Sequence, residues 1–212
     1  MDGVIADSEP VYYEAINDVL APLGKVMSPE LQRSMMGSGV AETWEILSRE
    51  LSLEGDLNSL IVAYDAALCR LLALVGKPLP GVTELVGALQ QRRVPYGLAS
   101  SSWPGWIEAL LGGVGLSKAF RVRVSATMVA NPKPAPDIYL EAAERLGVDP
   151  ARCIAIEDTP TGLKAAKAAG MLCVQSRSAS TAFPPLDDAD IVLDSLRDFD
   201  LTLLEDEVEH RA

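Results

Sequence analysis

The residues best suited to do chemistry include one lysine, a run of serines and several acids. A lysine stands between two prolines at Lys133, and a run of hydroxyl groups begins at Ser100. Acidic side chains occur at Asp2 and at the adjacent Glu157 and Asp158. Carboxylates that converge repel one another unless a cation lies among them, and sites built of oxygen ligands suit Mg²⁺. A magnesium ion, a lysine and hydroxyl or amide donors together bind a phosphate group.

The elements that must position these residues alternate between helix and strand after residue 80. Helices are predicted after Pro80-Gly81, near 106–111, over 137–146 and over 162–169. Strands are predicted over 96–99, 121–125, 153–156, 171–174 and 191–193. This alternation is typical of parallel strands joined by crossover helices. We therefore predict an α/β fold with a Rossmann-like, three-layer core around a parallel sheet.

The polar residues lie at the predicted carboxyl ends of these strands. In open α/β sheets, ligands bind in the crevice beyond those ends. Asp2, Ser100, Lys133 and the pair Glu157-Asp158 are therefore expected to converge on one crevice. The sequence predicts a phosphate site there.

The segment 11–79 has a different pattern from the rest of the chain. Apolar residues recur at helical spacings, first Val11, Ala15, Val19 and Leu23 and then Leu57, Leu60, Ile61, Tyr64, Leu68, Leu71, Leu72 and Val75. This predicts a helical cap domain over 11–79, inserted into a core domain formed by 1–10 and 80–212. Asp7, Ser8 and Glu9 are expected to cap the first helix of this insert.

Composition narrows the classes of function. The net charge of −12 argues against nucleic acid or an anionic membrane as the main partner. No uncharged apolar run reaches about 18 residues, so we expect no membrane span. The only histidine is His210, which nearly excludes Ser–His or Cys–His catalysis and a site with several histidines.

The three cysteines indicate a reducing compartment. Cys69, Cys153 and Cys173 form no C-x-x-C pair, and an odd number does not suit a disulfide framework. Cys153 and Cys173 lie in apolar runs and are expected in the core. We predict a cytoplasmic protein that is a monomer or a weak homodimer.

Four segments carry a family resemblance. DGVIADSEP, LASSS, KPAPDIYL and IEDTPTGLKAAKAAGM follow one another in this order and span nearly the whole chain. Together they resemble the haloacid dehalogenase-like (HAD-like) hydrolases, and most closely their capped small-molecule phosphatases and β-phosphoglucomutase-like members. The resemblance implies an enzyme that uses Mg²⁺ to hydrolyse a small phosphomonoester, such as a sugar phosphate or a phosphoglycolate-like compound.

The resemblance also implies roles for individual residues. Asp2 matches the second aspartate of the family motif Asp-x-Asp-Gly, which protonates the leaving oxygen and offers its backbone carbonyl to Mg²⁺. Glu157 and Asp158 match the acidic pair that holds the metal, directly or through water. Lys133 matches the lysine that neutralises phosphoryl charge and orients the carboxylates.

Phosphate binding is assigned to the loop after the strand 96–99. There the Ser100 hydroxyl and the Ser101 amide are expected to donate to phosphate oxygens. The cap segment Met35 to Glu42 is expected to reach over the same crevice, with glycines that suit a close approach.

One part of the family motif lies outside the printed residues. The family's nucleophile, which forms an aspartyl-phosphate, is the first aspartate of the motif, and Met1 takes the next position. Removing about five apolar side chains of its strand forfeits roughly 7 to 15 kcal/mol, as much as a typical domain's stability of about 5 to 15 kcal/mol. We therefore expect the native protein to have further N-terminal residues.

Two alternatives remain open at this point. One is a phosphomutase of the β-phosphoglucomutase type, although the segment SGVAET lacks the arginine followed by serine that is usual in that group. The other is a non-catalytic binding protein, which is expected if no nucleophile precedes Met1.

Overall fold

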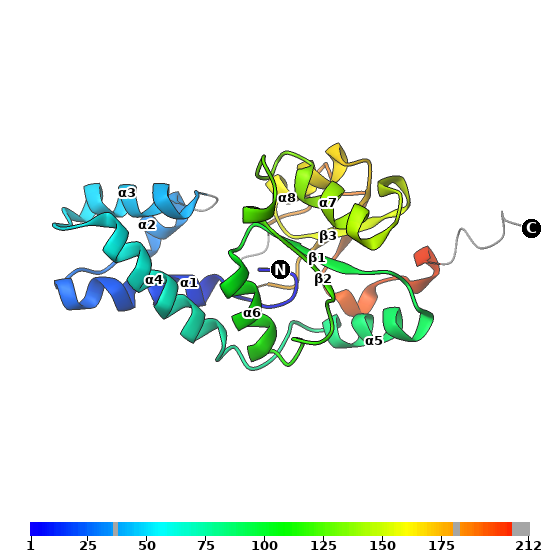
Figure 1. Ribbon diagram of the computed structural model, residues 1–212, viewed down its shortest axis with the longest axis horizontal. Coiled ribbons are helices and arrows are strands. Elements are labelled where there is room, and N and C mark those ends of the chain that lie inside the picture. The colour runs from blue at the N-terminus through cyan, green and yellow to red at the C-terminus, as the bar shows by residue number, and fades with distance from the viewer. Residues whose placement is uncertain (36–37, 180–182, 205–212) are drawn as a thin grey trace, which may run out of the picture.

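The computed structural model describes residues 1–35, 38–179 and 183–204 (Figure 1). Its first lobe consists of the helices α1 (Glu9–Leu20), α2 (Pro29–Ser34), α3 (Val40–Leu51) and α4 (Leu57–Leu72), with a 3₁₀ turn, η1 (Ala21–Leu23), after α1. No strand occurs within residues 11–35 and 38–79. The described part of the predicted insert is therefore helical.

The second lobe alternates strands and helices. Its strands are β1 (Gly97–Ser100), β2 (Val122–Ser125), β3 (Ile154–Glu157), β4 (Leu172–Ser176) and β5 (Ile191–Leu193). Its helices are α5 (Val82–Arg92), α6 (Pro104–Gly113), α7 (Asp137–Leu146) and α8 (Pro160–Ala168), with the 3₁₀ turns η2 (Ala126–Met128), η3 (Pro150–Arg152), η4 (Leu196–Asp198) and η5 (Leu201–Leu204). Within the part of the chain that the structure describes, no helix is long and apolar enough to cross a membrane.

All pairings between these strands are parallel. β1 pairs with β2, and β3, β4 and β5 form a second sheet in that order. The helices α7 and α8 lie on one side of the strands, and α5 and α6 lie on the other (Figure 1). The predicted α/β class and its layers are confirmed, but the strands are hydrogen-bonded as two sheets rather than one.

Small side chains allow the layers of the core to approach closely. The buried face of α8 consists of Gly162, Leu163, Ala165 and Ala166, and it packs on β3 and β4. On α7 the buried residues are Ile138, Tyr139, Ala142 and Ala143, and this helix packs on β1 and β2. Of the three free cysteines only Cys173 is buried, and Cys153 is half-buried, so the core expectation holds for Cys173 alone.

The first helix departs from the predicted pattern. Its buried residues are Ala15, Ile16 and Leu20, and Leu23 is 43% exposed. The predicted apolar stripe was wrong at Leu23 because α1 ends at Leu20. The 3₁₀ turn that follows closes at Gly24, whose left-handed backbone turns the chain away.

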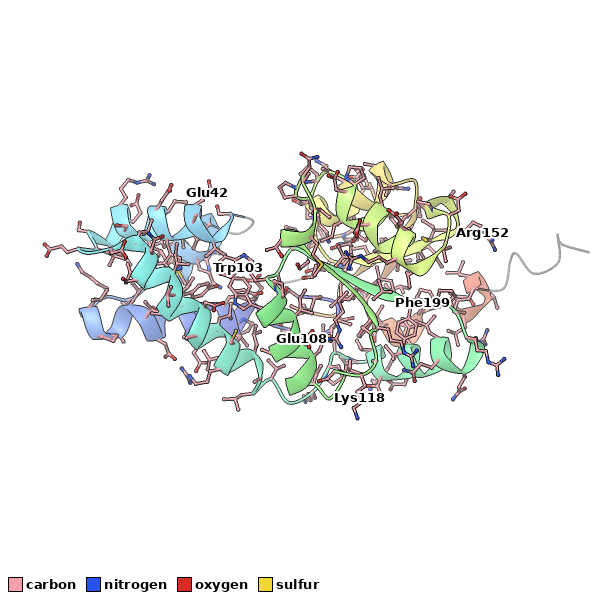
Figure 2. All side chains as sticks on the ribbon, in the orientation of Figure 1. Glu42, Trp103, Glu108, Lys118, Arg152 and Phe199 are labelled. Atoms are coloured by element: carbon pink, nitrogen blue, oxygen red, sulfur yellow. The ribbon has the colours of Figure 1, made fainter. Side chains whose placement is uncertain are left out.

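Helix α4 joins the helical lobe to α6 of the α/β lobe. The Trp106 indole N–H donates to the Asp65 carboxylate over 2.7 Å, and the Trp106 ring meets the Tyr64 ring edge-on at 5.8 Å. Trp103 stacks on Trp106 at 4.9 Å and lies between the helical lobe and the α/β lobe (Figure 2). This aromatic contact sets the helical lobe against the core.

The ends of α4 and α6 approach so closely that one position requires glycine. A Cβ added at Gly113 would lie 2.6 Å from the Leu72 carbonyl oxygen and 2.8 Å from that of Ala73. At Gly112, one position earlier in the same helix, an added Cβ would meet only the Ser117 hydroxyl oxygen, at 3.7 Å.

We predict that Gly113→Ala lowers the free energy of unfolding by about 1–3 kcal/mol, since the added methyl overpacks the contact between α4 and α6. The matched variant Gly112→Ala should be neutral or more stable by about 0.5–1 kcal/mol, because alanine favours a helix. Urea unfolding followed by tryptophan fluorescence measures both. Equal midpoints for the two variants would contradict the close approach.

Candidate active site

The predicted site residues lie at the carboxyl ends of parallel strands. Ser100 is the last residue of β1 and Glu157 the last of β3. Lys133 lies in the loop that follows β2 and precedes α7. Asp2 forms an isolated bridge with Ala6, within a tight turn of the first residues. The chain thus brings residues 155 positions apart in sequence toward one edge of the core.

Gly3 fixes the N-terminal turn against the end of β3. Its φ of +66° lies in the left-handed region, and an added Cβ would overlap the Asp158 carboxylate. The backbone beside Asp2 therefore runs directly against Asp158, which only glycine allows. This contact places the Asp2 and Asp158 side chains in one neighbourhood.

Lys133 points at a carboxylate of the protein itself. Its ammonium forms an ion pair with Glu157, and the two side chains are 10% and 8% exposed. The Tyr139 hydroxyl donates to the same Glu157 oxygen, and the Lys133 Nζ atom lies 4.8 Å from the centroid of the Tyr139 ring. An added Cβ at Gly162 would overlap the Glu157 carboxylate, so this pair also depends on a glycine.

The two adjacent acids have opposite electrostatic environments. Burial acts to raise the pKa of Glu157, but the Lys133 charge and the hydrogen bonds from Lys133 and Tyr139 lower it overall. The pKa of Asp158 is raised from 3.8 to about 7, first by burial and then by the charges of Glu157 and Asp2. The Met1 ammonium acts on Asp158 in the lowering direction. A crowded carboxylate of this kind would ionise more easily beside a cation.

Three hydroxyl groups donate to the Asp2 carboxylate. Ser8 and Tyr12 contact its Oδ1 atom at 2.5 and 3.2 Å, and Ser102 contacts Oδ2 at 2.8 Å. Burial and the Asp2 charge hold the pKa of the Tyr12 phenol well above its ordinary value, so this hydroxyl stays protonated. Ser8 occupies the N-cap position of α1 without a side-chain bond to the helix. The capping role expected for Ser8 was wrong because its hydroxyl is bound to Asp2.

Sequence reasoning did not select Tyr12 or Ser102 as contacts of the site. One signal was available for Tyr12. Ser8 at the N-cap of α1 and Tyr12 are four residues apart, and residues with this spacing lie on the same face of a helix. Ser102 is the last of three consecutive serines, and nothing in the sequence distinguishes it from the other two.

The two predicted phosphate ligands differ in exposure. Ser100 is 3% exposed, and its Oγ accepts the backbone N–H of Ser102 over 3.2 Å. Ser101 is exposed in the turn that follows β1. Their contact with a phosphate stays a prediction. In the cap segment expected over the crevice, Met36 and Gly37 lie outside the described residues, as does His210.

The donors around Asp158 fit a magnesium ion only in part. Among residues 1–35, 38–179 and 183–204, no three His, Cys, Asp or Glu side chains gather as a metal-binding group. Glu157 is bound to Lys133, which leaves the Asp158 carboxylate, with the backbone carbonyl of Asp2, closest to the expected arrangement. A carboxylate with backbone and water oxygens suits Mg²⁺, which commonly keeps several waters.

Comparison with known proteins establishes the family. Residues 1–170 match the family model described as haloacid dehalogenase-like hydrolase. The chain belongs to the haloacid dehalogenase-like hydrolases. The resemblance inferred from the four sequence segments is therefore confirmed.

Relatives of this hydrolase carry phosphatase names. It is 34% identical over 171 residues to a phosphorylated carbohydrates phosphatase of Thermotoga maritima, covering 81% of this chain and 79% of the relative. It is 35% identical over 180 residues to the fructose-1-phosphate phosphatase YqaB of Escherichia coli strain K12, covering 84% and 93%. Its structure is similar to that of CbbY from Rhodobacter sphaeroides in complex with phosphate, with a TM-score of 0.85, 28% identity and coverage of 97% and 96%.

The raised pKa of Asp158 predicts how stability depends on pH. Between pH 3.8 and about 7 the folded chain keeps a proton that the unfolded chain has lost. Stability should therefore fall as pH rises through this window, and Asp158→Asn should remove that fall. Urea unfolding in chelator at pH 5 and pH 8 measures the difference.

The control for this prediction is Asp187→Asn, which changes an exposed aspartate outside the site. It should follow the pH profile of the wild type. At pH 8, added Mg²⁺ should stabilise the wild type and Asp187→Asn but not Asp158→Asn. Parallel profiles for wild type and Asp158→Asn would contradict the burial and charge crowding described above.

Proposed function

We propose that this hydrolase uses Mg²⁺ to cleave small phosphomonoesters, with sugar phosphates as its substrate class. The observation that carries the proposal is the convergence of the Asp2 and Asp158 carboxylates with the buried Lys133–Glu157 pair at one edge of the core. Relatives named for phosphorylated carbohydrates and for fructose 1-phosphate support the choice of a sugar phosphate.

The charges of this edge suit a phosphate dianion. The Asp158 carboxylate and the backbone carbonyl of Asp2 would hold Mg²⁺, which stabilises negative charge on the phosphoryl oxygens. The Lys133 ammonium adds positive charge at a position set by Glu157 and Tyr139. The hydroxyl of Ser100 and the amide of Ser101 are the proposed donors to the phosphate oxygens.

Bond cleavage also requires a proton donor and a nucleophile. When the bond between phosphorus and the ester oxygen breaks, a proton carried by Asp2 passes to that oxygen, which leaves as an alcohol, and Asp2 becomes a carboxylate. We propose the family's aspartyl-phosphate route, in which the Asp2 carboxylate then takes a proton from the water that attacks the aspartyl-phosphate and releases phosphate. This route requires an aspartate two positions before Asp2, so the assay should use both the printed chain and a form extended with the codons upstream of it.

We predict phosphate release from fructose 1-phosphate by the extended form, with Mg²⁺ required and chelator abolishing it. Lys133→Ala should lower kcat/KM by roughly 10²-fold, as expected for loss of one fixed charge that stabilises the transition state. The control is Lys118→Ala, which changes an exposed lysine in the connection between α6 and β2 (Figure 2) and should leave kcat/KM unchanged.

Three outcomes would contradict the proposal. No turnover on a panel of sugar phosphates and phosphoglycolate by either form would favour the binding-protein alternative. Conversion of a sugar 1-phosphate without release of phosphate would favour a phosphomutase. Equal losses in Lys133→Ala and Lys118→Ala would exclude the proposed role of Lys133.

A further inference from the structure

The Asp2 carboxylate is held from two lobes of the molecule. Its Oδ1 atom accepts from Ser8 and Tyr12 on the side of helix α1, and its Oδ2 atom accepts from Ser102 in the loop after β1. The Tyr12 and Ser102 hydroxyl oxygens are themselves 3.4 Å apart. A carboxylate held at both oxygens cannot rotate without breaking one of these bonds.

The Tyr12 hydroxyl is fixed by packing of its ring. That ring meets the Trp106 ring edge-on, with centroids 6.1 Å apart and planes at 80°. Trp106 in turn contacts the Tyr64 ring and donates to Asp65, both on helix α4. Tyr12 therefore has a position determined by α4 and α6, whereas the short side chain of Ser8 can turn its hydroxyl about one bond.

The neighbouring tyrosine has a different partner. The Tyr13 hydroxyl donates to the Met27 carbonyl oxygen over 2.9 Å, within the helical lobe. Two adjacent tyrosines of the same helix thus use their hydroxyl groups in different places. This pair supplies a variant and its matched control.

We infer that Tyr12 is a positioning residue, whose hydroxyl holds the Asp2 carboxylate against Ser102 in the orientation needed for proton transfer to the leaving oxygen. The inference rests on the proposed function, because the proton transfer by Asp2 belongs to it. Without the hydroxyl, Oδ1 loses its rigid donor and the carboxylate turns about Ser102 and Ser8. Misplacing a catalytic group by a small distance lowers the rate of the chemical step more than it lowers the affinity for substrate.

The leaving group distinguishes positioning from general structural support. A sugar alcohol is a poor leaving group and needs the proton from Asp2 as the bond breaks. The p-nitrophenolate ion leaves without a proton. Loss of alignment at Asp2 should therefore lower kcat/KM, which reports the steps up to departure of the leaving group, for fructose 1-phosphate and spare it for p-nitrophenyl phosphate. A general loss of structure would lower kcat/KM for both.

The test uses Tyr12→Phe, which keeps the ring and removes only the hydroxyl. For fructose 1-phosphate, kcat/KM should fall by about 10- to 100-fold, part of the roughly 10²- to 10⁴-fold that general acid catalysis supplies. For p-nitrophenyl phosphate, kcat/KM should stay within about threefold of the wild type. Tyr13→Phe should leave both substrates unaffected.

A second variant tests whether Tyr12 and Ser102 act on the same group. Ser102→Ala should show the same contrast between substrates. The double variant should lose less than the product of the two single losses, because residues that hold one carboxylate are coupled. Equal losses on both substrates in Tyr12→Phe, or fully additive losses in the double variant, would overturn the inference.

Failure of the proposed function would be recognised separately, since the wild type itself would then show no turnover. In that case crystal structures of the wild type and Tyr12→Phe decide. A changed orientation of the Asp2 carboxylate in Tyr12→Phe, but not in Tyr13→Phe, supports the positioning role. An Asp2 carboxylate that keeps the same orientation in both variants overturns it.

Discussion

Lys133 and Glu157 pair their charges in a region where neither side chain is more than 10% exposed. Burying two charges is costly, and the cost is offset only when both are paired and hydrogen-bonded. Tyr139 supplies a further bond to Glu157, and glycine at position 162 leaves room for the carboxylate. Much of the site follows from this pair, because it holds the lysine in place and puts a fixed negative charge beside Asp158.

The charge of Glu157 also explains why two adjacent acids behave differently. Glu157 has its cation, whereas Asp158 is buried beside two negative charges, those of Glu157 and Asp2. A cation beside Asp158 would relieve that crowding. Burial and this crowding of negative charge therefore raise the pKa of Asp158 in the free protein, and the same crowding favours a cation in the proposed chemistry.

The helical lobe contributes side-chain contacts to the site. Helix α1 brings Ser8 and Tyr12 to Asp2, and the aromatic contacts of α4 with α6 hold the lobe in the position from which Tyr12 reaches. Membership of the hydrolase family and the names of the relatives support phosphate-ester chemistry. The contacts among Tyr12, Asp2 and Ser102 connect the helical lobe to a residue with a proposed role in that chemistry.

The sequence by itself determined the fold class, the family and the succession of helices and strands along the chain. These depend on apolar periodicity and on motifs that are local in the chain. It predicted the helix 137–146 with its observed bounds. It started α8 two residues late and ended it one residue late, since Thr159 rather than a later residue caps that helix. It also selected Lys133, Glu157 and Asp158 correctly as neighbours at strand ends.

Only the tertiary structure decided which side chains meet. That Lys133 pairs with Glu157, that Ser8 binds Asp2 instead of capping α1, and that Tyr12 and Ser102 share one carboxylate all depend on contacts between residues up to 100 positions apart. Hydrogen bonds of this kind require matching within a few tenths of an ångström. Residue type and spacing along the chain do not contain that information, because it arises from the packing of α7 beside β3 and of α1 and α4 against α6.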